Sequence, residues 1–304
     1  MDKKQYYIKV SANISILKGM NVTFPKGDYF CPLCKGGFSE DQVSDILTEE
    51  DVPQHSLGGA RITLTCRDCN SSCGHKIDSH LLNYHKALEQ KLFLPGTDRN
   101  VELKDGENVL RAELRVHSRD DMQLCVNTKH NNPKFWEYFH DNILLPNNDI
   151  YISNRKQKHD LRQISAAILK NAYLLLFAKT GYSFLFDPYY DKLREQIMNP
   201  NAYILPERLW TEQSVNLADG IYLTTDNHYR GFFVVYSLIL KQKYKVCCLI
   251  PTPKVDYLEA CMHLRGVEPG TTIQLKLLPC LNFHSDKNAV QRLRNWCYGW
   301  NSDL

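Results

Sequence analysis

The sequence CPLC at residues 31–34 and the sequence CRDC at residues 66–69 decide the fold of the N-terminal part of this chain. Together they read C-x2-C-x31-C-x2-C, a spacing that lets two tight turns meet and offer four thiolates as a tetrahedron. Four sulfurs complete the coordination sphere of Zn2+, so such a site is structural. We therefore expect Cys31, Cys34, Cys66 and Cys69 to hold a structural zinc ion; the alternative is four free cysteines in a core.

The remaining composition is that of an ordinary globular protein. The chain has 304 residues, of which 43% are hydrophobic and 23% are charged, and 11 are cysteines. An odd number of cysteines, four of them at knuckle spacing, indicates thiolate ligands in a reducing compartment rather than a disulfide framework. The sequence shows no leader pattern, and its apolar runs are far short of the ~20 residues that a bilayer span needs. We expect a soluble, cytoplasmic protein that contacts no membrane.

The segment between the two cysteine pairs carries a second motif. It contains an acidic pair before a proline, a Gly-Gly pair and a strand that leads into the second knuckle, and Asn, Gly and Asp follow that knuckle. These residues are Glu50-Asp51-Val52-Pro53, Gly58-Gly59, Ile62-Thr63-Leu64-Thr65, Asn70, Gly74 and Asp78. Over residues 29–92 the order and spacing resemble the HNH (ββα-metal) endonucleases, in the variety whose motif lies between two cysteine knuckles.

The resemblance implies a catalytic Mg2+ or Mn2+ ion in addition to the zinc. Such an ion needs hard oxygen ligands and open positions for a phosphate oxygen and the leaving oxygen. Glu50, on the first strand of the motif, and Asn70, at the start of the helix, are the expected ligands. The histidine that activates water in the family is replaced here by Asp51, which we expect to act as the base or to bind the ion.

Three nearby histidines, His55, His75 and His80, could replace the missing base. His55 lies in the motif loop and His75 directly follows Gly74, although either could instead be structural or simply exposed. Arg61, Arg67 and Lys76 surround the motif and could neutralise phosphates of a nucleic acid. The net charge of +3 is too small to indicate such a ligand by itself.

The rest of the chain suggests an α+β fold in two domains. Loose alternation over residues 5–17 predicts a strand, and apolar residues three or four apart predict a helix over residues 77–92. Pro95-Gly96 then marks a domain boundary. Residues 96–304 are expected to form a larger α+β companion domain with a mostly antiparallel sheet, used for substrate recognition or partner contact. A helix over residues 155–179 that ends before Gly181 is its clearest element.

These expectations lead to a metal-dependent endonuclease that hydrolyses DNA phosphodiester bonds. One ββα unit nicks one strand, so cleavage of both strands would need a dimer or two encounters. RNA is left open as a substrate, as is a homodimer or a partner protein, and the resemblance implies a bacterial or phage defence context. The alternative is a zinc-braced nucleic-acid-binding or protein-interaction module whose motif is inactive. A third reading is an enzyme that acts only within a complex.

Overall fold

The computed structural model describes residues 2–142, 151–154, 159–184, 186–205, 210–212, 217–224, 226, 228–265, 275–280 and 286–299. The fold is α+β with antiparallel sheets, as the sequence predicts. Within the described residues, no helix is both long enough and apolar enough to cross a bilayer.

Two compact units make up the chain. The first contains Met1–Leu82, Asp160–Ile239 and Lys243–Leu304, and the second contains Asn83–His159 and Leu240–Gln242. This division differs from the boundary predicted at Pro95-Gly96, because the chain returns after residue 160 to pack with the cysteine-containing segment. The N-terminal module and most of the expected companion domain therefore share one unit.

The first element is a helix, so the strand predicted over residues 5–17 is wrong. Helix α1 (Lys3–Lys18) begins with a capping box. The Gln5 amide donates a hydrogen bond to the Asp2 carboxylate, and the Asp2 amide donates one to the Gln5 side chain. Its buried residues Tyr6, Val10 and Leu17 fall at helical spacing, which the loose alternation of apolar residues obscured.

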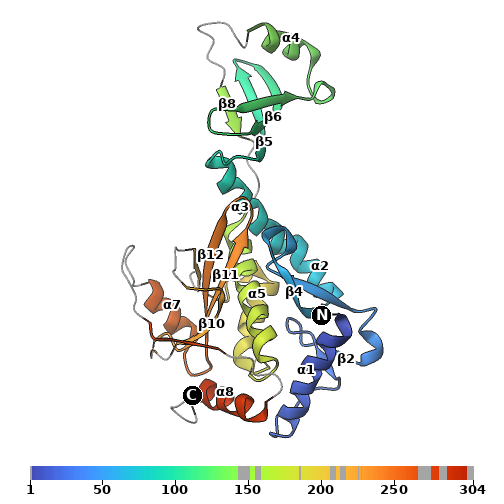
Figure 1. The fold of residues 1–304 in the computed structure, drawn as a ribbon, viewed down its shortest axis with the longest axis vertical. Coiled ribbons are helices and arrows are strands. Elements are labelled where there is room, and N and C mark those ends of the chain that lie inside the picture. The colour runs from blue at the N-terminus through green and yellow to red at the C-terminus, as the bar shows by residue number, and fades with distance from the viewer. Residues whose placement is uncertain are drawn as a thin grey trace. The chain divides into compact units, whose positions relative to one another are not determined.

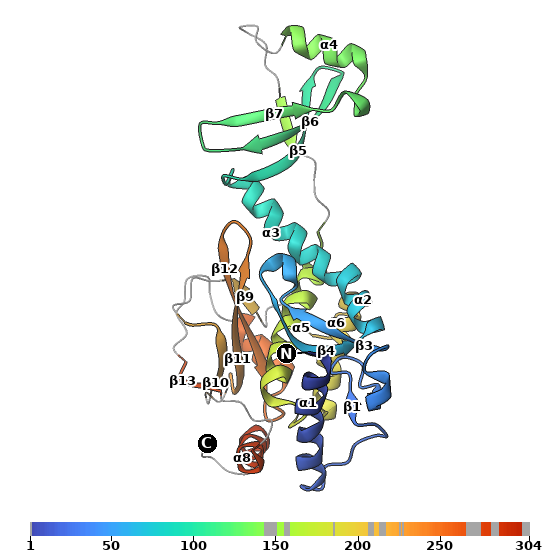
Figure 2. The same cartoon turned by 45° about the vertical axis from the view of Figure 1, so that its right-hand side comes forward.

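The cysteine segment folds as a hairpin followed by a helix (Figure 2). Its elements are β1 (Tyr29–Phe30), β2 (Gly37–Phe38), β3 (Leu47–Val52), η2 (His55–Leu57), β4 (Ala60–Cys66), α2 (Arg67–Cys73), η3 (Gly74–Asp78) and α3 (Ser79–Lys91). Strands β3 and β4 are antiparallel, with Glu50 opposite Thr63 and Asp51 opposite Arg61, so Ile62 is an extra residue in β4. The helix predicted over residues 77–92 is confirmed as α3.

Helix α5 (Leu161–Thr180) is the centre of the first unit. It packs against the β3–β4 hairpin and against β11 and β12 of a five-stranded sheet (Figure 1). It ends at Gly181, whose φ of 60° suits glycine. The strand order of the sheet is β13 (Leu277–Pro279), β10 (Gly220–Thr224), β11 (Gly231–Ile239), β12 (Lys243–Pro251) and β9 (Trp210–Glu212).

Three further helices belong to this unit. They are α6 (Asp191–Met198), α7 (Tyr257–Arg265) and α8 (Lys287–Tyr298). Trp296 of α8 is buried, and its ring lies 5.4 Å from that of Phe232 on β11, which fixes α8 to the sheet.

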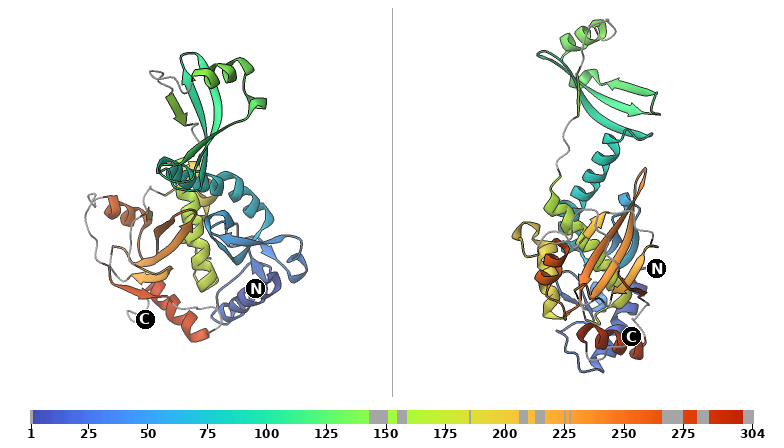
Figure 3. Two further views of the ribbon diagram at one scale, coloured as in Figure 1. Left: turned by 45° about the horizontal axis from the view of Figure 1, so that its top comes forward. Right: turned by 90° about the vertical axis from the view of Figure 1, so that its left-hand side faces the viewer.

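Within the described residues, the second unit contains a four-stranded antiparallel sheet, a further helix and the part of α3 from Asn83 onward (Figure 3). The strand order is β7 (Met122–Val126), β6 (Asn108–Val116), β5 (Thr97–Asp105) and β8 (Tyr151–Asn154). Helix α4 (Pro133–Asn142) places Phe139 in a small core with Leu103 and Leu110.

Candidate metal centre and the polar site beside it

The four predicted cysteines meet in one cluster. The sulfurs of Cys31, Cys34, Cys66 and Cys69 all lie within 4.8 Å of one another, and those of Cys34 and Cys66 are 3.8 Å apart. Zn–S bonds of about 2.3 Å in a tetrahedron place the sulfurs about 3.8 Å apart. The donor set and its size therefore fit a structural zinc ion.

Backbone geometry shapes the first knuckle. The Lys35 amide donates to the Cys31 carbonyl (2.9 Å), and Lys35 adopts a positive φ of 60° that closes the turn. The amides of Gly36 and Cys66 point at the sulfurs of Cys34 and Cys31, each at 3.4 Å. Hydrogen bonds from the other three thiols hold the pKa of Cys34 below its ordinary value, while the same contacts raise the pKa of Cys31 and Cys69.

Helix α5 contacts this knuckle through a hydrogen bond. The Tyr173 hydroxyl donates to the Pro32 carbonyl (2.9 Å) and accepts a hydrogen bond from Arg194 (2.9 Å). From the other side, the Tyr29 hydroxyl donates to the Leu64 carbonyl of β4 (2.7 Å). The cluster is thus fixed to both the hairpin and the central helix.

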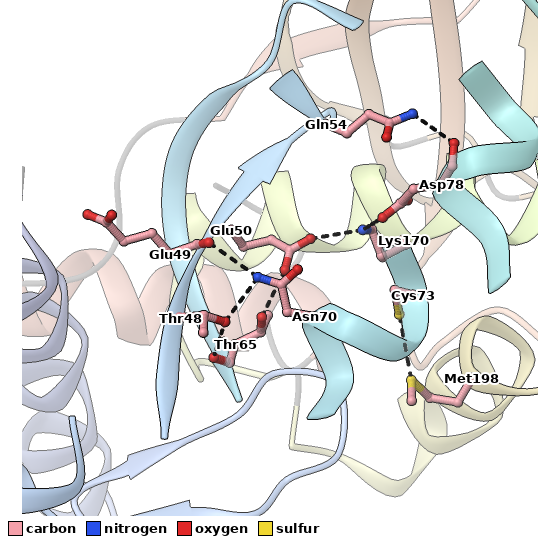
Figure 4. A network of polar contacts seen from close by, with 10 residues as sticks. All are labelled: Thr48, Glu49, Glu50, Gln54, Thr65, Asn70, Cys73, Asp78, Lys170 and Met198. Carbon is pink, nitrogen blue, oxygen red and sulfur yellow. Dashed lines mark hydrogen bonds and ion pairs between the residues drawn. The ribbon is translucent and has the colours of Figure 1, made fainter. Parts of the chain in front are cut away.

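Glu50 lies in a closed polar site next to the cluster (Figure 4). Glu50 is only 3% exposed, and its Oε2 accepts a hydrogen bond from the Thr65 hydroxyl (2.8 Å). Its Oε1 contacts the Lys170 ammonium at 2.9 Å, and that ammonium also contacts Oδ2 of Asp78 at 2.6 Å. Both carboxylate oxygens of Glu50 therefore have protein partners.

Lys170 is the cation of this site, and it comes from the middle of α5 with 0% of its side chain exposed. Burial by itself would lower the pKa of Lys170, but the negative charges of Asp78 and Glu50 raise it well above its ordinary value. Burial raises the pKa of Asp78, and the Lys170 ammonium opposes that effect. The ammonium therefore stays charged between two acidic side chains.

Asn70 belongs to the same network. Its Nδ2 donates to the Thr48 hydroxyl (3.0 Å) and to the Glu49 carbonyl (3.3 Å). The Thr48 hydroxyl donates to the Thr65 carbonyl (3.2 Å), and the Thr65 hydroxyl reaches Glu50. Glu50 and Asn70, the two predicted metal ligands from hairpin and helix, are thus connected through two threonines.

Asp51 is not part of this network. It is half-buried and follows Glu50 on β3, and successive residues of a strand face opposite sides. Its neighbour across the hairpin, Arg61, pairs with Glu49 at 2.9 Å. The expected base and the expected metal ligand thus face different sides of the hairpin.

The other predicted residues lie at the surface. His55 is exposed on η2, and His75 and Lys76 are exposed on η3. Arg67, also exposed, donates to the Asp45 carbonyl, which fixes its guanidinium to the loop before β3.

The sequence motif does not include Lys170 as a site residue, although its position in an apolar helix indicates a buried charge. It is a single charged residue within the run ISAAILKNAYLLLF at residues 164–177, in a helix that is buried on nearly every side. A charge in such a helix requires a partner of opposite sign. The partners, however, are 120 and 92 positions away, and the helix alone does not identify them.

Comparisons of the chain with protein-family models, with curated proteins and with solved structures find no match.

Proposed function

We propose that this chain is a nucleic-acid-binding protein built on a zinc-braced ββα scaffold, and that the scaffold does not hydrolyse the strand it binds. Nucleic acid as the ligand rests on the resemblance of residues 29–92 to HNH endonucleases. The absence of hydrolysis rests on the Lys170 ammonium between Glu50 and Asp78.

The position of Lys170 conflicts with a divalent ion on Glu50. Mg2+ binds oxygen at about 2.0–2.1 Å, so an ion on Oε1 would lie within a few ångströms of the ammonium that contacts this oxygen at 2.9 Å. Like charges at such a distance repel strongly where water is scarce. Because Glu50 is only 3% exposed, a phosphate group could contact it only after neighbouring side chains move.

The general base supplies an independent argument. Asp51 stands where the family has histidine. A carboxylate with an ordinary pKa near 4 is also a weaker base than imidazole. Metal ligand and base are both altered, which fits a scaffold that has kept its shape and lost its chemistry.

The second candidate is a metal-dependent endonuclease acting on DNA. One observation favours it: Glu50, Asn70 and Asp78, from hairpin and helix, meet in one polar network. If an ion displaced Lys170, these three residues would supply oxygen ligands of the kind that Mg2+ and Mn2+ prefer. In that case the Lys170 ammonium occupies the metal position only while no ion is bound.

The test combines binding and cleavage on the zinc-loaded full chain. We expect single-stranded or duplex DNA to bind with an affinity that falls with salt, and supercoiled plasmid to stay intact in Mg2+ or Mn2+. Lys76→Ala should lower the slope of log affinity against log salt by about one, whereas Lys179→Ala on α5 should leave it unchanged.

Two results would overturn the proposal. Nicking that Glu50→Gln or Asn70→Ala abolishes would establish the endonuclease instead. Failure to bind DNA or RNA at low salt would remove nucleic acid as the ligand and leave a protein-interaction module.

A further inference from the structure

A second group of metal-ligating side chains lies on the C-terminal sheet, outside the cysteine segment. His228 from the turn between β10 and β11 meets Glu259 and His263 from α7, with one ligand atom of each within 4.8 Å of the others. The Glu259 Oε1 lies 4.0 Å from Nδ1 of His228 and 3.8 Å from Nε2 of His263. The arrangement is a compact triangle of one oxygen and two imidazole nitrogens.

This triangle is close to the size of a metal site. Bonds of about 2.0–2.2 Å to nitrogen and oxygen in a tetrahedron separate the ligand atoms by about 3.3–3.5 Å. The distances from Glu259 Oε1 to the two nitrogens, 4.0 and 3.8 Å, exceed this by about 0.3–0.7 Å. Rotamer adjustments of exposed side chains can supply such a contraction without movement of the backbone.

Local structure positions each ligand. Glu259 and His263 are four residues apart on α7, so they lie on one face of the helix. Asp256 fixes the start of α7 by accepting hydrogen bonds from the amides of Leu258 (2.7 Å) and Glu259 (3.3 Å). Buried Ala260 and Cys261 hold the opposite face of the helix against the protein.

His228 is held in a similar way. Its amide donates to the Asp226 carboxylate (3.0 Å), and the Tyr229 amide donates to the Asp226 carbonyl (3.2 Å), which makes a tight turn. The end of this turn is tied to the end of β12, because the Thr252 amide donates to the Arg230 carbonyl (3.1 Å). Both ligand-bearing segments are therefore anchored to the same sheet.

The two imidazole rings provide an independent argument. Their centroids are 3.9 Å apart. The two rings already lie against each other, so little movement is needed to bring one nitrogen of each to a common ion.

We propose that His228, Glu259 and His263 bind a divalent transition-metal ion, Zn2+ in the first instance, as a second site beyond the cysteine cluster. Two imidazoles and one carboxylate are ligands that suit Zn2+, and three protein ligands leave a coordination position for water or another ligand. Exposed fractions of 55%, 54% and 40% for the side chains of His228, Glu259 and His263 keep that position open to solvent. This site is independent of the function proposed for the hairpin.

The test counts zinc in the full-length protein after dialysis against a low free concentration of Zn2+. Wild type should hold two equivalents per chain, and a mild chelator should remove one of them and leave the ion of the cysteine cluster. His263→Ala and His228→Ala should each hold one equivalent. Replacement by Co2+ gives a second readout, because the exposed site lacks the thiolate-to-metal absorption of the cysteine site.

A matched control is His140→Ala. His140 is an exposed histidine whose Nδ1 lies 3.2 Å from the Asp141 carboxylate, and it belongs to neither group of candidate metal ligands found among the described residues. This variant should keep both equivalents. One equivalent in wild type, or two in His263→Ala, would overturn the proposal.

Discussion

The cysteine cluster and the Glu50 site both use residues of strand β4, Cys66 and Thr65, yet they differ in what completes them. Four like ligands from two knuckles complete the cluster, and each knuckle is recognisable from its own four residues. The Glu50 site is completed by Lys170 of α5, which the motif does not contain. A metal site encoded locally can be read from spacing, whereas a site that accepts a distant side chain cannot.

Removal of a cysteine should have the largest effect on folding stability. Structural zinc contributes about 10–16 kcal/mol to the folding of small zinc modules, which equals or exceeds the stability of a typical domain. Cys66→Ser should therefore lose the ion and unfold the first unit, as measured by zinc content and thermal denaturation. Cys125→Ser, in the second unit, is the control and should keep both zinc and fold. A folded, zinc-loaded Cys66→Ser protein would contradict a structural role for the cluster.

Removal of Lys170 should have the next largest effect. Lys170→Met leaves Glu50 and Asp78 buried without their cation, which should cost about 3–5 kcal/mol of unfolding free energy. Urea denaturation measures this loss. Lys179→Met, at an exposed position of the same helix, should change stability by no more than about 0.5 kcal/mol. Equal stability of the two variants would show that the ion pairs are not needed.

The loop between β3 and β4 can be tested through its glycines. A Cβ atom on Gly59 would lie 1.4 Å from the Pro53 carbonyl oxygen, and the backbone must move to relieve this overlap. Gly59→Ala should therefore lower stability by more than about 1 kcal/mol. Gly74→Ala meets no atom within 4 Å and has helical geometry, so it should be neutral or stabilising. A neutral Gly59→Ala would mean that the loop is not held in this conformation.

The smallest effect is expected at Asn70. Asn70→Ala removes the hydrogen bonds to Thr48 and to the Glu49 carbonyl, at a cost of about 1 kcal/mol. Zinc content should stay at its wild-type value, because Asn70 is not one of the four cysteine ligands. Loss of zinc in Asn70→Ala would show that the two sites are not separable.

Sequence reasoning succeeded where ligands or apolar faces recur at short spacing. The cysteine cluster, α3, α5 and the antiparallel character of the sheets all follow from such patterns. It failed for α1, whose capping by Asp2 outweighed a weak alternation of apolar residues. The domain boundary and the Lys170 contacts depend on pairs of residues far apart in the chain, which periodicity does not reveal.

The most direct test of the central claim asks whether Lys170 occupies the place of a divalent ion. Unfolding free energy is measured with and without Mn2+ for two proteins. One carries His263→Ala alone, which removes the second proposed metal site and keeps Lys170, and the other carries Lys170→Met in addition. We predict that Mn2+ leaves the protein with Lys170 unchanged and stabilises the one with Lys170→Met, because the ion can then bind Glu50 and Asp78. Stabilisation of the protein with Lys170 by Mn2+ that Glu50→Gln abolishes would contradict the account, since the ion would then displace the ammonium.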